Sequence, residues 1–137
     1  RTAANLPQSA QSALFTISGG RVVLTSLTGE VTTAVQNQTN NTKVVYNPTS
    51  GSDKDLSGVV ELQNAAVGLY LGLDPDLTSQ TTPALLAATS YVWANLIRPV
   101  TLGPGTVDLN CVASSTGQIK WTLTYRSLDP GAKVVAT

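Results

Sequence analysis

The strongest constraint on the fold is a period of two in residues 118–126, which read QIKWTLTYR. The apolar members of this alternation are Ile119, Trp121, Leu123 and Tyr125. A strand over these residues has one apolar and one polar face. Residues 105–113 (GTVDLNCVA) repeat the pattern before an SSTG turn. The two segments predict an antiparallel hairpin with one buried face, which further strands must cover.

Strand signals recur at short intervals along most of the chain. Runs such as RVVLTSLT (21–28) and KVVYN (43–47) are separated by Gly, Pro, Asn and Asp. Only 12% of the 137 residues are charged, and polarity comes instead from Thr, Ser, Asn and Gln. Because β-branched Thr suits a half-exposed pleated surface, the sequence predicts an all-β fold. We expect one antiparallel β-sandwich, jelly-roll-like, with at most one short helix.

Residues 1–12 (RTAANLPQSAQS) differ from the rest because they are polar and lack periodicity. They predict an extended N-terminal arm, which precedes a β-sandwich domain over residues 13–137. Two partners could hold such an arm in place: a neighbouring subunit or its own domain. We expect that deleting residues 1–12 leaves the fold nearly intact.

Residues 74–97 give conflicting signals. Helical spacing of apolar residues favours a short helical turn or an irregular segment near 84–89. The aromatic and β-branched residues that follow favour a strand over 90–102. Tyr91 and Trp93 are candidates for a subunit or partner interface, because large aromatic side chains anchor protein contacts.

The residue inventory excludes several kinds of catalytic and metal site. The chain has no histidine and one cysteine, so histidine-dependent triads and thiolate zinc clusters cannot form. We expect Cys111 and Trp121 to be buried in the core. Asp53/Asp55 and Asp74/Asp76 could offer oxygen ligands to calcium, but neither pair matches an EF-hand loop and both predict solvated turns. No enzyme activity, metal or cofactor is therefore expected.

Charge distribution argues against two classes of partner. The eight basic and eight acidic residues give a net charge of zero without charged runs. Nucleic acid and anionic membrane surfaces are normally bound by basic patches, so neither is expected as a partner. No apolar run approaches the roughly 20 residues of a membrane-spanning helix.

Two blocks of sequence, residues 15–39 and 110–137, resemble small β-rich structural proteins of tailed bacteriophages that decorate, or cement, the head. The resemblance lies in strand and turn patterns such as FTISGG, LTGEVTTAVQ, GQIKWTL and LDPGAKVVA. It covers most of the chain.

The resemblance implies a structural virion protein on the outer surface of an icosahedral capsid, bound to the major capsid protein. It also implies self-association, with a homotrimer favoured and a homodimer as the alternative. The capsid-binding arm would comprise Arg1, Thr2, Ala3, Ala4, Asn5, Leu6 and Pro7. A tail, neck or fibre component, and a carbohydrate- or cell-surface-binding β-sandwich, are the alternative functions.

Overall fold

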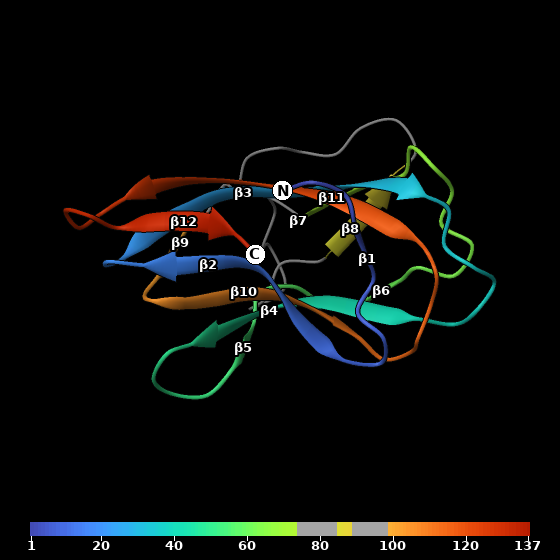
Figure 1. Ribbon diagram of the computed structural model, residues 1–137, viewed down its shortest axis with the longest axis horizontal. Coiled ribbons are helices and arrows are strands. Elements are labelled where there is room, and N and C mark those ends of the chain that lie inside the picture. The colour runs from blue at the N-terminus through green and yellow to red at the C-terminus, as the bar shows by residue number, and fades with distance from the viewer. Residues whose placement is uncertain (74–84, 89–98) are drawn as a thin grey trace.

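The computed structural model describes residues 1–73, 85–88 and 99–137, and within these ranges every regular element is a β-strand (Figure 1). Two six-stranded antiparallel sheets pack face to face. This arrangement confirms the all-β sandwich predicted from the sequence.

The first sheet has the strand order β1-β11-β3-β7-β8, and β9 pairs with the other end of β3. Its strands are β1 (Ala4–Asn5), β3 (Val22–Thr33), β7 (Tyr70–Leu73), β8 (Leu85–Ala88), β9 (Val100–Leu102) and β11 (Gln118–Ser127). The long strand β3 therefore forms the centre of this sheet, with β11 along one side and β7 and β9 along the other.

The second sheet has the order β12-β2-β10-β4-β5, with β6 also paired to β4. Its strands are β2 (Gln11–Ser18), β4 (Asn41–Pro48), β5 (Lys54–Asp55), β6 (Val60–Glu61), β10 (Gly105–Cys111) and β12 (Lys133–Ala136). Strand β10 lies in the middle of this sheet, between β2 and β4.

The predicted hairpin of residues 105–126 is wrong, because β10 and β11 belong to different sheets. Residues 112–117 cross from the second sheet to the first, a separation of about 10 Å in face-packed sheets. Both strands still bury one face, since Cys111 and Trp121 are 2% and 1% exposed. Their predicted burial is confirmed, but the two apolar faces meet across the core instead of side by side.

Four of the chain crossings between the sheets form two adjacent pairs. Residues 6–10 cross beside residues 112–117, as the bond from the Cys111 amide to the Ala10 carbonyl shows. At the opposite end, residues 19–21 cross beside residues 128–132. There the carbonyl oxygen of Gly131 occupies the space that a Cβ on Gly19 would need, and Gly19 has a φ of 75°. The Gly19-Gly20 turn therefore joins two sheets, where glycine permits both the dihedral and the close approach.

Of residues 84–102, the structure describes 85–88 and 99–102, and the first of these two segments differs from the sequence prediction. Residues 85–88 form strand β8, so the helical turn expected near 84–89 is wrong for these residues. Its pairing with β7 explains this, because main-chain bonds to a neighbouring strand override weak helical spacing. Of the strand predicted over 90–102, residues 100–102 are β9. The interface candidates Tyr91 and Trp93 lie outside the described residues.

Candidate functional site

The N-terminal arm packs against its own domain. The Arg1 amino group donates to the Trp121 carbonyl in the first sheet at 3.0 Å, and Arg1 Nη1 donates to the Ala13 carbonyl in the second sheet at 2.9 Å. Arg1 therefore spans the gap between the sheets at their common edge. Of the two arrangements considered from the sequence, the structure shows packing on the arm's own domain.

Leu6 makes the arm part of the hydrophobic core. It is 2% exposed, and its amide donates to the Gly117 carbonyl at 3.3 Å. The Gln8 side chain then bridges the carbonyls of Leu6 and Ser115 at 2.8 and 3.0 Å. Strand β2 already begins at Gln11, two residues before the predicted start of the domain. Because Leu6 fills core space, we now expect loss of residues 1–12 to destabilise the fold, contrary to the sequence-based expectation.

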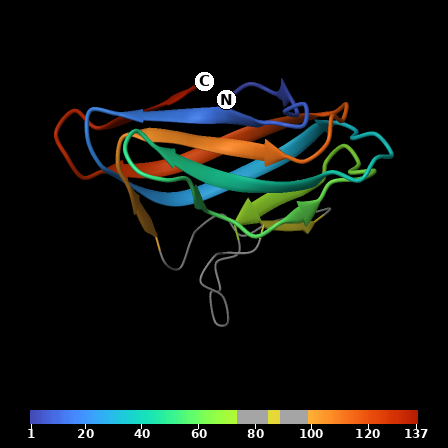
Figure 2. The same ribbon diagram turned by 90° about the horizontal axis from the view of Figure 1, so that it is seen from below.

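The outward side of the arm remains open to a partner. Thr2, Ala3 and Asn5 are exposed, whereas Arg1, Ala4 and Pro7 are partly buried. Strand β1 ends the strand order of the first sheet, so one of its edges has no neighbour among the described strands. The two chain termini lie close together in both views (Figures 1 and 2). This side of the sandwich also carries the edge strand β12, on which Val135 is 52% exposed.

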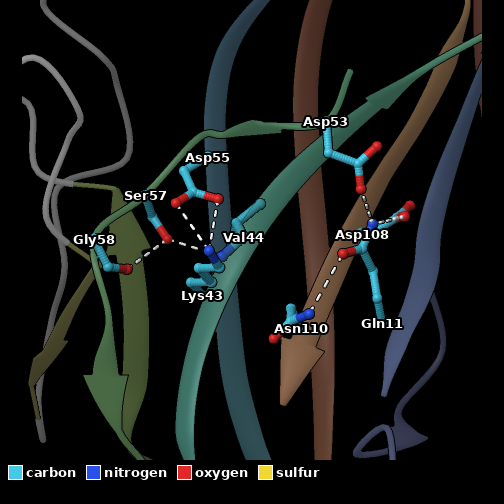
Figure 3. Close-up of polar contacts among 9 residues, drawn as sticks. All are labelled: Gln11, Lys43, Val44, Asp53, Asp55, Ser57, Gly58, Asp108 and Asn110. Carbon is cyan, nitrogen blue, oxygen red and sulfur yellow. Dashed lines mark hydrogen bonds and ion pairs between the residues drawn. The ribbon is translucent and has the colours of Figure 1, made fainter. Parts of the chain in front are cut away.

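A second polar feature lies on the outer face of the second sheet (Figure 3). Gln11 Nε2 on β2 donates to Asp108 Oδ2 on β10 and to Asp53 Oδ2 in the loop before β5, both at 2.9 Å. Gln11 Oε1 accepts a longer bond, 3.4 Å, from Asn110 Nδ2. Asp108 is only 4% exposed, although it points away from the core. The loop carrying Asp53 thus folds over the sheet and is tied to it through one glutamine.

The two aspartates that the sequence offered as a pair, Asp53 in this loop and Asp55 on β5, have different partners. Asp55 forms an ion pair with Lys43 on β4 at 2.8 Å, whereas Asp53 bonds Gln11. Ser57 fixes the end of the loop, because its Oγ accepts from the Val44 amide and donates to the Gly58 carbonyl, both at 2.8 Å. The sequence predicted a solvated turn for Asp53 and Asp55, and both are exposed, but the strand register directs them to different partners. The other pair, Asp74/Asp76, lies outside the described residues.

The sequence did not predict that Gln11 forms hydrogen bonds to both Asp53 and Asp108. The only available signal was a carboxylate between two apolar residues of a strand, in Val107-Asp108-Leu109. Nothing in the spacing indicates that a loop 55 residues earlier covers that position.

The surroundings of Asp129 and Cys111 shift the pKa values of these two groups. Hydrogen bonds from the Arg21 side chain, then from its backbone amide, lower the pKa of Asp129 to about 2. This pair joins the two crossings at 19–21 and 128–132 on the surface. Burial raises the pKa of the Cys111 thiol, an effect partly offset by a hydrogen bond from Thr42. Cys111 is therefore a protonated core side chain at neutral pH.

Searches against known proteins give no relatives for this arrangement. No protein-family model, curated protein or solved structure matches the chain. Across residues 1–73, 85–88 and 99–137, no three His, Cys, Asp or Glu side chains gather closely enough to hold a metal ion between them. The same residues contain no helix long and apolar enough to cross a membrane.

Proposed function

We propose that this protein is a structural virion component that decorates the outside of an icosahedral phage capsid, binds the lattice of the major capsid protein and stabilises it. The proposal is supported by the resemblance of residues 15–39 and 110–137 to phage head decoration proteins, and the β-sandwich fold suits the β-rich character of these proteins. It assigns no catalysis and no cofactor to the chain.

The observation that carries the proposal is the geometry of the N-terminal arm. It is anchored at Arg1 and Leu6, yet it presents Thr2, Ala3 and Asn5 outward, beside the edge of β1 that has no neighbour among the described strands. An extended segment at a sheet edge can pair with a strand of another protein through main-chain hydrogen bonds. Because the arm is already ordered on its own domain, such a contact costs little conformational entropy.

Self-association fits the same role. A homotrimer, or alternatively a homodimer, would offer several arms to equivalent lattice positions, so that individually weak contacts add through effective concentration. Light scattering on the purified protein gives the oligomeric state directly.

A sedimentation assay with heads that lack the protein tests the arm. The variant Thr2→Asp/Ala3→Asp adds two charges to exposed arm positions, and we expect it to bind heads at least about tenfold more weakly than the unmodified chain, a loss of about 1.4 kcal/mol. The control Ala66→Asp/Val67→Asp adds the same charges to exposed residues on the other side of β3 and β11. It should bind normally.

Two results would count against the proposal. Heads that bind neither the unmodified chain nor the control would exclude decoration, and equal binding by the arm variant would exclude the arm as anchor. Densitometry of virion proteins separates a decoration protein, present in hundreds of copies, from a tail, neck or fibre component present in tens or fewer. No observation on the described residues favours the carbohydrate-binding alternative.

A further inference from the structure

The carboxylate of Asp108 is buried, yet one of its two oxygens has no hydrogen-bond partner. Asp108 is 4% exposed, and its Oδ1 atom is buried without a hydrogen-bond partner. A buried carboxylate is normally paired, hydrogen-bonded on both oxygens or bound to a metal. The side chain points toward Gln11 and Asp53 on the outer face of the sheet (Figure 3). An oxygen with unused bonding capacity is therefore part of the same small cluster.

The cluster also lacks positive charge. Asp53 and Asp108 both accept from Gln11 Nε2, a neutral amide, so two carboxylates converge on one nitrogen without compensation of their charge. Among residues 1–73, 85–88 and 99–137, neither carboxylate forms an ion pair. The basic side chain of Lys43 is bonded instead to Asp55. A buried carboxylate that has no positively charged partner in the protein can be neutralised by a bound cation.

From these observations we propose that Asp53, Asp108 and Gln11 form a binding site for a divalent cation, with calcium as the preferred ion. This site does not depend on the proposed capsid function. Calcium takes six to eight oxygen ligands from carboxylates, amide carbonyls and water, and tolerates irregular geometry. Magnesium requires near-ideal octahedral geometry, and zinc prefers nitrogen and sulfur ligands, which this cluster does not offer.

The amide of Gln11 can become a ligand without losing its other bond. Turning it over presents Oε1 to the cation and Nε2 to Asn110. If the Asn110 amide also turns over, its Oδ1 accepts a hydrogen bond from Gln11 Nε2. This bond would replace the present 3.4 Å bond from Asn110 Nδ2 to Gln11 Oε1. The site would then contain both carboxylates and one amide oxygen, with water completing the coordination. The cation would fasten the loop carrying Asp53 to strands β2 and β10.

Calcium titration by isothermal calorimetry, together with thermal unfolding in calcium or EDTA, tests this site on the full chain. We expect binding in the range of about 10⁻⁴–10⁻³ M, as in extracellular calcium modules, and a higher Tm in about 10 mM calcium than in EDTA. Asp53→Asn and Asp108→Asn should each weaken binding at least about tenfold. Glu30→Gln is the charge-matched control, because it removes a carboxylate from β3 in the other sheet and leaves the bond between Lys43 and Asp55 intact; its affinity should stay within about twofold.

Absence of calorimetric heat and of any Tm shift in the unmodified chain would overturn the proposal. So would equal calcium responses in the unmodified chain, Asp53→Asn and Asp108→Asn, since the ion would then bind elsewhere. If Asp108→Asn fails to fold, Asp53→Asn alone decides the question, because Asp53 is an exposed loop residue. A larger response to magnesium than to calcium would contradict the assigned preference.

Discussion

Replacing Leu6 by alanine tests whether the N-terminal arm is part of the folded domain. Leu6 is 2% exposed and belongs to the same core cluster as Trp121. The substitution removes an isopropyl group, whose loss from the core costs about 2.4 kcal/mol at about 0.8 kcal/mol per carbon. The residual cavity adds to this cost, but the arm lies at an edge of the sandwich and can move inward to fill part of it. We therefore expect a loss of about 3 kcal/mol, within the range of about 2–5 found for such changes.

Guanidinium unfolding followed by tryptophan fluorescence and circular dichroism measures this loss. A domain of this kind is stable by about 5–15 kcal/mol, so a shift of about 3 kcal/mol is easily resolved. The control is Thr2→Ala, an exposed position in the same arm, which should change stability by less than about 0.5 kcal/mol. A loss below about 1 kcal/mol for Leu6→Ala would show that the arm is not packed as described, and would refute the reasoning.

The other predictions concern the core, one surface ion pair and one turn. Trp121→Ala should lower the free energy of unfolding by about 3–5 kcal/mol at an unchanged denaturant slope, because the indole is buried between the sheets. Because the pKa of Asp129 falls from 3.8 to about 2 in the fold, its ionised form stabilises the protein above about pH 4, and this contribution disappears as the pH falls through about 2. The difference in Tm between the unmodified chain and Asp129→Asn should therefore narrow from pH 5 to pH 2, and a constant difference would contradict it. Gly19→Ala should cost more than Gly68→Ala in thermal unfolding. Both glycines have a positive φ, worth about 1–2 kcal/mol, but only a Cβ on Gly19 meets the backbone of Gly131. Equal losses would show that this close approach is absent.

The hairpin predicted over residues 105–126 shows that strand patterns do not determine which strands pair. Alternation in residues 105–126 correctly predicts two strands and their inward residues, including Cys111 and Trp121. It cannot distinguish strands that pair in one sheet from strands that face each other across a core, because both arrangements bury the same side chains. Residues 112–117 are long enough to cross between sheets, but a connection of this length can also close a hairpin, so only the packing of the two sheets decides between them.

The hydrogen-bond partners of the polar side chains show a second limit of prediction from the sequence. The sequence identified Asp53 and Asp55 as neighbours, yet their bonds go to Gln11 and Lys43 on different strands. Asp108 became notable only when the fold placed the loop over β10 and buried its Oδ1 atom. Such partners are 42 and 97 positions from Gln11 in the chain, beyond any local pattern.

By itself, the sequence determined the all-β class, the strand segments around the core and the inward side chains, because side-chain alternation in a strand is a local property of the backbone. Only the tertiary structure decided which strands pair, that Leu6 anchors the arm to its own domain, and that Asp53 and Asp108 converge on Gln11. These features depend on the paths of the chain crossings, and a crossing is chosen by the packing of the whole core rather than by the residues within it.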